Sequence, residues 1–146
     1  MLKKITYPLN YGLSKTGLPL IAVELQGKNL CFLIDTGATL NLLDKRVYDY
    51  FNDKLPHQLN KSLKTANFGI DGIETNAKRA EIEFLFESYT FTTKFTIFDI
   101  SIAFDKVEEE SGIQIHGILG NEFLLENEWI IDYDKKVISH KQRIPN

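Results

Sequence analysis

The sequence contains one cysteine, Cys31, so the chain cannot form an internal disulfide. Cys31 lies within the apolar run 30–34, where a small buried hydrophobe is expected, whereas reactive thiols occupy exposed, electropositive surroundings. We therefore predict that Cys31 is a core residue with no redox function. No stretch approaches the roughly 20 apolar residues that a transmembrane helix needs, and no export signal is visible. These absences predict a cytoplasmic protein with no membrane partner.

The sequence also lacks a basic cluster. Its 17 Lys and Arg residues are scattered along the chain, and 20 Asp and Glu residues outnumber them, giving a formal net charge of -3. Proteins that bind nucleic acid concentrate Lys and Arg on one face or stripe. We therefore expect no nucleic-acid partner.

Histidines are few and widely separated. His57, His116 and His140 show none of the short spacings of metal ligands, which favours surface histidines or hydrogen-bonded core histidines. Three consecutive glutamates, 108–110, fall within the polar stretch 105–112, which we expect to be a solvated loop and not a metal site. No metal and no other cofactor is predicted.

What is present fits one globular domain over residues 1–146. This length matches the usual size of a compact domain, and the 43% hydrophobic content is close to the globular average. Short runs of Val, Ile, Phe, Tyr and Thr, bounded by Gly, Asn and Asp, dominate the chain. This pattern predicts a mainly β protein.

The first predicted β-hairpin joins strands 18–25 and 29–34 through Gln26-Gly27-Lys28. Its second strand is apolar throughout, which predicts burial on both faces, and it runs directly into Asp35. Further hairpins are expected over 62–74, bent around 69–72, and over 129–140. Between them, alternating strands containing Ala80 to Phe86 and Phe91 to Ile97 should turn at Glu87-Ser88.

Only two stretches predict helix. Asp44 is a suitable N-cap, and Val47, Tyr48 and Phe51 follow at helical spacing, which indicates a short amphipathic helix ending by Asp53. A second brief helix is expected over 121–126, after the apolar run 115–119 and Gly120.

The stretch with the clearest chemistry is Asp35-Thr36-Gly37-Ala38, which directly follows the buried strand. A carboxylate in this position needs an explanation, and Gly37 permits a tight turn and a close approach to a ligand. Thr36 adds a hydroxyl and a backbone N–H beside the carboxylate. The Asp-Thr-Gly triplet would arise by chance in roughly 3% of chains of this length, so its setting decides its meaning.

That setting resembles the retropepsin family of aspartic peptidases, whose signature is an apolar strand followed by Asp-Thr-Gly-Ala. Two further elements occur in the family's order, so the resemblance spans about 18–138. The stretch 62–74, with Phe68-Gly69-Ile70-Asp71-Gly72 at its tip, resembles the substrate-covering flap. Ile118-Leu119-Gly120-Asn121 resembles the second signature, and Trp129 to Tyr133 resembles the strand after it.

The resemblance implies a closed β-barrel acid-protease fold with one or two short helices. It also implies that Asp35 is catalytic, with Thr36, Gly37 and Ala38 as active-site support. The flap tip would bind an extended peptide, with Phe68, Ile70, Ile118 and Leu40 as apolar wall residues.

Two positions depart from the retroviral members. Those proteins usually have an Asp two residues after the motif Gly and an Arg directly after the second-signature Gly, and these form an ion pair. Here the positions are Thr39 and Asn121. Either a neutral hydrogen bond replaces the pair, or the support is built differently.

One Asp-Thr-Gly per chain leads to an expectation about assembly. Aspartic peptidase chemistry uses two carboxylates, so each chain of a homodimer would supply one Asp35 at an isologous interface. The resemblance thus implies an aspartic endopeptidase that activates water between two Asp35 carboxylates. The family's arrangement further implies that Thr36 of each chain holds the opposing loop.

Alternative interpretations remain open at this stage. Asp35 could be a structural turn residue, because Asp followed by Gly is common in turns. The same fold could serve as a dimeric peptide-binding module without catalysis, since fold does not determine activity. A monomeric β-barrel that binds a small apolar ligand is a third candidate. An ionisable residue in a buried site favours the peptidase.

Overall fold

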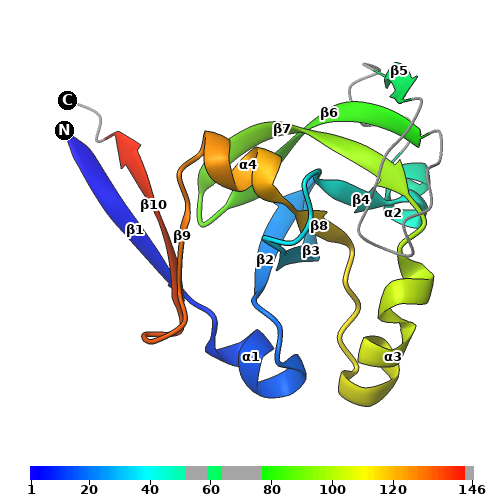
Figure 1. The fold of residues 1–146 in the computed structure, drawn as a ribbon. Helices are drawn as coiled ribbons and strands as arrows, with labels where there is room; N and C mark the ends of the chain where they lie inside the picture. Colours follow the sequence, from blue (N-terminus) through cyan, green and yellow to red (C-terminus); the bar gives the residue numbers. More distant parts are fainter. Residues whose placement is uncertain (52–58, 64–76, 144–146) are drawn as a thin grey trace.

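The computed structural model describes residues 1–51, 59–63 and 77–143, without the side chains of 59–63 and 77 (Figure 1). Within this part of the chain, strands predominate and the helices are short. The mainly β fold class is therefore confirmed. No helix in these ranges is long and apolar enough to cross a membrane.

Six strands form a closed ring. They are β2 (Leu20–Leu25), β3 (Lys28–Ile34), β8 (Gly117–Leu119), β4 (Leu42–Asp44), β7 (Tyr89–Phe98) and β6 (Ala77–Phe86), in that order. A pairing between Glu24 of β2 and Leu85 of β6 closes the ring. β5 (Leu59–Leu63) adds to the outer edge of β6. The closed β-barrel expected from the family resemblance is thus confirmed.

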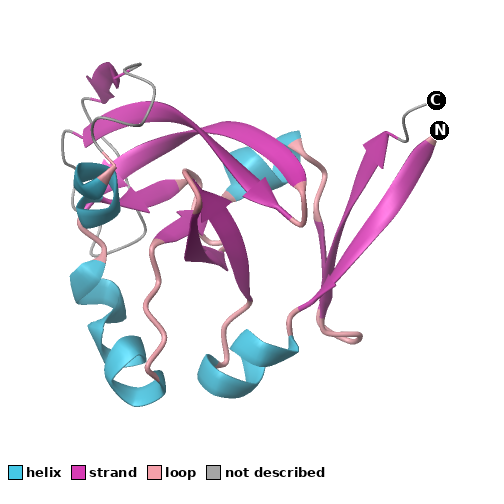
Figure 2. Ribbon diagram, turned by 180° about the vertical axis from the view of Figure 1, so that it is seen from behind, coloured by secondary structure: helices cyan, strands magenta, loops and turns pink. Residues whose placement is uncertain are grey.

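A second sheet carries both ends of the chain. β1 (Leu2–Pro8) pairs along its whole length with β10 (Val137–Arg143), which also pairs with β9 (Ile130–Asp132). β1 and β10 extend away from the barrel, with Leu2 of β1 opposite Arg143 of β10 at the far end of the sheet (Figures 1 and 2). The predicted closing hairpin is confirmed as β9 and β10, whereas β1 was not predicted.

The first hairpin forms as the sequence predicts. Its turn places Gln26 and Gly27 at positive φ, and β2 and β3 pair antiparallel from Leu20 and Leu33 to Leu25 and Lys28. Leu30, Phe32 and Ile34 of β3 point into the main core, while Leu33 joins a second cluster on the other face. Burial on both faces is confirmed, and it fixes the position of Asp35 at the end of the strand.

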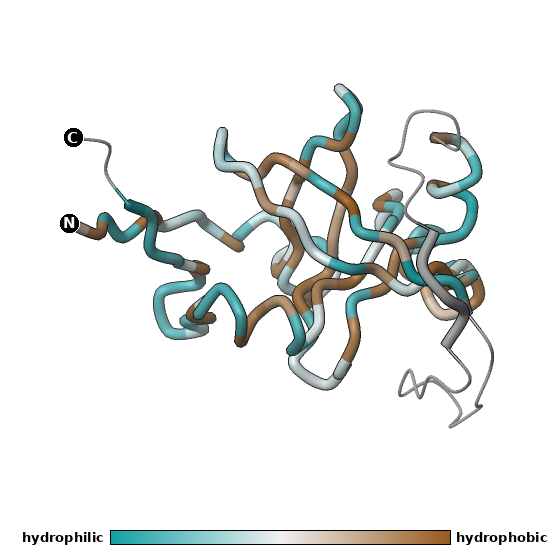
Figure 3. The backbone as a smooth tube through the Cα atoms, turned by 90° about the horizontal axis from the view of Figure 1, so that it is seen from above, coloured by the Kyte–Doolittle hydropathy of each residue, from teal (hydrophilic) through white to brown (hydrophobic). Residues whose placement is uncertain are grey.

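The hairpin of β6 and β7 contributes seven buried side chains to the main core. Glu87 and Ser88 form its turn with φ values of 50° and 69°, in agreement with the prediction. Hydrophobic residues gather along the barrel strands in Figure 3. The inward side chains of the two strands are all buried: Ala80, Ile82, Phe84, Phe86, Phe91, Phe95 and Ile97.

Both predicted helices are present. α2 (Lys45–Tyr50) begins at Asp44, whose side chain accepts a hydrogen bond from the Arg46 N–H, and it buries Val47 and Tyr48. α4 (Asn121–Glu126) follows Gly120 and buries Phe123 and Leu124. Asp53 lies outside the described residues.

The expected loop over 105–112 is wrong, because these residues belong to helix α3 (Ser101–Ser111). Ser101, Phe104, Val107 and Ser111 are half-buried and recur at helical spacing, and Asp99 accepts hydrogen bonds from the Ser101 N–H and hydroxyl. The helix ends at Gly112, with φ 76°. The three glutamates are exposed on α3, so their contact with solvent was predicted correctly, but their helical conformation was not.

Helix α1 (Asn10–Thr16) was also missed. It ends at Gly17, whose φ of 77° suits glycine, and the Gly17 N–H donates to the Leu13 carbonyl. α1 and α3 lie side by side at one end of the molecule (Figures 1 and 2). The count of one or two helices is therefore too low, since there are four in the described ranges.

Candidate active site

The Asp35-Thr36-Gly37-Ala38 motif lies in a loop, residues 35–41, that joins β3 to β4 across the end of β8. β8 runs parallel to β3 and antiparallel to β4, so it lies between the two strands that the loop connects. The Asp35 N–H donates to the Leu119 carbonyl at 3.0 Å. The first signature is therefore anchored directly to the second. We call residues 35–41 the Asp35 loop.

Asp35 is half-buried, and one of its carboxylate oxygens is held within the loop. The Gly37 N–H donates to Oδ1 at 2.9 Å, and the Ala38 N–H donates to the Asp35 carbonyl at 3.2 Å. A Cβ at position 37 would lie 3.1 Å from Oδ1, so glycine allows this close approach. The carboxylate is thus oriented through Oδ1, while Oδ2 has no donor among the described residues.

The side chains of the motif divide between core and surface. Ala38 is buried in the second cluster with Leu20, Leu33 and Ile118, whereas Thr36 and Gly37 are exposed. Ile118, expected as a wall residue, is 3% exposed and packs beneath the loop. Leu40 is half-buried beside the same cluster.

Gly120 and Asn121 hold the Asp35 loop by its carbonyl groups. The Asn121 N–H donates to the Ala38 carbonyl, and the Asn121 side-chain amide donates to the Thr36 carbonyl, both at 2.8 Å. Gly120 leaves no room for a side chain, because a Cβ would lie 2.4 Å from the Leu40 carbonyl oxygen. The second signature therefore supports the first through hydrogen bonds to its backbone.

Of the two alternatives for positions 39 and 121, the structure has the second. The support is built differently, and within the described part of the chain no side-chain hydrogen bond joins Thr39 and Asn121. The Asn121 amide binds the Thr36 carbonyl, and the Thr39 carbonyl accepts the Glu122 N–H at 3.1 Å. Asn121 thus contacts the loop through a backbone group and does not need an acidic side chain at position 39.

Asn41 is a site residue that the sequence did not reveal. Its side chain is fully buried; Oδ1 accepts the Gly120 N–H at 2.9 Å and Nδ2 donates to the Lys94 carbonyl at 3.0 Å. These bonds connect the end of the Asp35 loop to β7 and to the second signature. A buried asparagine beside an apolar strand is the signal that could have indicated it, because buried amides need several partners.

The predicted flap tip, Phe68-Gly69-Ile70-Asp71-Gly72, lies outside the described residues. β5 and β6, the strands on either side of it in the sequence, pair antiparallel, with Leu63 opposite Ala77.

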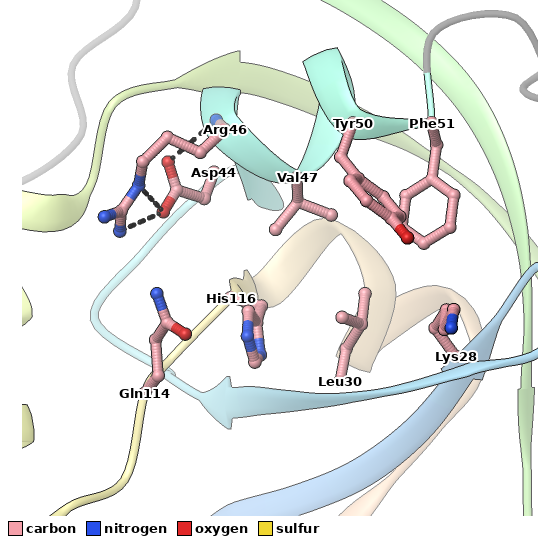
Figure 4. Close-up of a pocket in the computed structure, with 9 residues that line it drawn as sticks. All are labelled: Lys28, Leu30, Asp44, Arg46, Val47, Tyr50, Phe51, Gln114 and His116. Atoms are coloured by element: carbon pink, nitrogen blue, oxygen red, sulfur yellow. Dashed lines mark hydrogen bonds and ion pairs between the residues drawn. The ribbon is translucent and has the colours of Figure 1, made fainter.

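A cavity of about 330 Å³ lies away from the Asp35 loop, between α2 and the beginning of β3 (Figure 4). The His116 ring forms part of its wall, and its Nδ1 accepts the Cys31 N–H at 3.0 Å. Burial lowers the pKa of His116, while the Asp44 carboxylate opposes this effect. His116 is therefore a hydrogen-bonded core histidine, as predicted. The residues around the cavity are Lys28, Leu30, Asp44, Arg46, Val47, Tyr50, Phe51, Gln114 and His116.

Two other residues singled out in the sequence are also structural. Cys31 is half-buried against the second cluster and not fully buried as predicted. Burial raises the pKa of its thiol to about 11, which disfavours the reactive thiolate. His140 is 2% exposed, and its ring stacks on Trp129 at a centroid distance of 5.1 Å. His57 lies outside the described residues.

Two solved structures share this arrangement of elements. A retropepsin-like aspartic protease from Rickettsia conorii matches over 97% of this chain and 92% of its own, with a TM-score of 0.54 and 16% identity. The chain has the retropepsin fold. The retroviral protease-like domain of Ddi1 from Leishmania major matches over 80% of this chain and 82% of its own, with a TM-score of 0.53 and 11% identity. No family model matches the chain, and no curated protein matches its sequence.

The retropepsin fold accounts for how the two signatures meet. They are 85 residues apart between Thr36 and Asn121, yet the insertion of β8 between β3 and β4 brings them into hydrogen-bonding contact. At 11–16% identity the likeness shows the fold alone. Chemistry has to be argued from the residues of the Asp35 loop.

Proposed function

We propose that this protein is an aspartic endopeptidase in which Asp35 from each of two identical chains forms the catalytic dyad. The observation that carries the proposal is the geometry of Asp35. Its carboxylate is half-buried in a loop supported by the second signature, with Oδ1 oriented by the Gly37 N–H and no donor to Oδ2 among the described residues.

Two such carboxylates brought within about 3 Å of each other cannot both ionise easily, so the pair would hold one shared proton over an intermediate pH range. The ionised Asp35 would take a proton from a bound water, and that water would attack the scissile carbonyl. The protonated Asp35 of the other chain would donate a hydrogen bond to the developing oxyanion. The C–N bond would then break as the proton taken from the water passes from the first Asp35 to the leaving amine. The reaction needs no covalent intermediate with the protein.

The exposure of Thr36 and Gly37 supports a second chain in the site. Both lie at the accessible tip of the loop, whereas the base of the loop is held by Asn121 and Leu119. The Thr36 hydroxyl is accessible to an opposing loop, and the Gly37 backbone can approach a substrate closely. An extended peptide would lie across the two-fold axis between the paired tips.

The test is cleavage of a denatured-protein or peptide library between about pH 4 and 7, with sedimentation in parallel. Asp35→Asn keeps the shape of the side chain and removes its charge, so we expect cleavage to fall at least about 100-fold with the dimer retained. Asp134→Asn is the matched control, because Asp134 is an exposed aspartate in the β9–β10 turn.

Cleavage that survives in Asp35→Asn would contradict the proposal. A wild-type dimer that binds peptides but cuts none of them would instead support the peptide-binding module. A stable monomer at high concentration would remove the shared dyad altogether.

A further inference from the structure

An ion pair lies directly behind the Asp35 loop. Arg79 projects from β6, and its Nη2 donates to both carboxylate oxygens of Glu122 in α4, at 2.8 and 2.7 Å. The side chains of Arg79 and Glu122 are only 12% and 27% exposed. The pair is therefore largely shielded from water, unlike Lys45 and Asp49 on α2, whose side chains are 62% and 57% exposed.

Glu122 holds the last residues of the Asp35 loop through two further bonds. Its Oε1 accepts the Asn41 N–H at 2.6 Å, and its own N–H donates to the Thr39 carbonyl at 3.1 Å. One residue therefore fixes both a donor and an acceptor of the loop backbone. Arg79 binds the same carboxylate and so restrains the Glu122 side chain in the position that accepts the Asn41 N–H.

Asn41 extends these contacts to the strand that anchors Asp35. Its Oδ1 accepts the Gly120 N–H, and the preceding residue, Leu119, accepts the Asp35 N–H. Hydrogen bonds thus run from Arg79 through Glu122 and Asn41 to the backbone that holds Asp35. The path joins β6 of the barrel to the candidate catalytic carboxylate.

Stability alone is a poor explanation for this ion pair. Removing two charges from water costs free energy that the attraction between them does little more than offset, and apolar replacements of similar volume are often as stable. The Arg79 Nε is also buried without a hydrogen-bond partner in the described residues, which adds a cost. The two charges instead fix the geometry of the Asp35 loop through the contacts of Glu122.

We propose that Arg79 and Glu122 are positioning residues that set the Asp35 loop for dyad formation. This inference rests on the proposed function, because the loop is positioned for a reaction.

The experiment compares Arg79→Met, Glu122→Gln and the double variant R79M/E122L with wild type. Each single variant leaves one partner partly buried and uncompensated, so melting temperature and kcat should both fall. The double variant removes both charges. We expect its melting temperature to recover only in part, because E122L also leaves the buried Asn41 N–H without its acceptor. We expect kcat to stay at least about tenfold below wild type and KM to change less than about threefold.

The matched control is the exposed pair on α2, changed to K45M/D49L, which should leave kcat within about twofold of wild type. Dimer content is measured by sedimentation for every variant. If R79M/E122L recovers both melting temperature and kcat, the ion pair is structural only and the inference is overturned.

Amide hydrogen exchange separates this inference from the proposed function. If the protein proves to have no peptidase activity, the proposed function fails but the loop can still be observed. Exchange at Asn41 and Gly120 should be at least about tenfold faster in R79M/E122L than in wild type. E122L removes the acceptor of the Asn41 N–H, and the Asn41 side chain that accepts the Gly120 N–H loses support. Unchanged exchange at both amides would overturn the positioning role, whatever the activity.

Discussion

At the scale of single residues, the room around each residue and its hydrogen bonds explain the site better than the chemical type of the residue alone. Gly120 is required because two carbonyl oxygens of the Asp35 loop, from Ala38 and Leu40, lie where its Cβ would be. Its φ of -96° is open to any residue, so the requirement is steric and not conformational. Gly37, in the first signature, is less crowded, because a Cβ there would lie 3.1 Å from the Asp35 Oδ1 and meet no other atom so closely.

Gly120→Ala should therefore destabilise the fold strongly. The methyl group would force the Asp35 loop away from β8, and we expect the free energy of unfolding to fall by about 2 kcal/mol or more, measured by urea denaturation. Gly17→Ala is a useful comparison, because Gly17 has open space around its Cβ and a φ of 77°. Its cost should be only about 1 kcal/mol. Equal costs for the two variants would rule out the steric argument.

At the scale of secondary-structure elements, the periodicity of buried side chains determined which helices and strands could be predicted from the sequence. β2, β3, β6 and β7 carry buried side chains along most of their length, so their alternation or continuous apolar character is visible. α3 buries no residue fully and has mostly polar side chains, which hid its spacing. The bonds of Asn41 to Glu122 and Gly120 span about 80 residues, and single-sequence patterns carry no signal for such polar pairs.

The packing of β10 leads to a prediction about pH. His140 lies among Trp129, Phe91 and Tyr89, and its Nε2 is buried without a partner in the described residues. Burial lowers the pKa of His140. The unfolded chain then binds a proton more readily than the folded one, so this group makes stability fall as pH drops below the unfolded pKa of about 6.5 towards the folded pKa.

Replacing His140 with Phe should remove that part of the pH dependence. We expect wild type to lose more unfolding free energy between about pH 7.5 and 5 than His140→Phe, as measured by chemical denaturation at each pH. The lowered pKa of His116 acts in the same direction, so a smaller slope should remain in the variant. Identical slopes in the two proteins would show that His140 does not titrate with unfolding.

At the scale of the whole molecule, the chain holds a single Asp-Thr-Gly motif, so the proposed dyad is complete only in an assembly. The chain contains one Asp-Thr-Gly, and its tip residues Thr36 and Gly37 are exposed. Fold and motif could be predicted from sequence because the family resemblance covers both. The flap residues 68–72 remain a prediction, since they lie outside the described part of the chain.

Subunit mixing tests the assembly directly. Wild-type chain is refolded together with a ninefold excess of Asp35→Asn chain, and cleavage is measured at constant wild-type concentration. Random pairing leaves about one in ten wild-type chains with a wild-type partner, so activity should fall about tenfold. The same excess of Asp134→Asn chain should instead raise activity about tenfold. Activity that is unchanged by the Asp35→Asn chain would show that one chain suffices.

The way the Asp35 loop is braced has a consequence for how the protein can diversify. Asn121 and the Glu122 N–H bind the loop at the carbonyl oxygens of Thr36, Ala38 and Thr39, atoms that every amino acid possesses. The exposed Thr39 side chain takes no part in this support. Substitutions at position 39 can therefore accumulate in a lineage, or be introduced in a directed-evolution library, without reshaping the loop. The side chain at position 39 can thus vary while the backbone around Asp35 keeps its conformation.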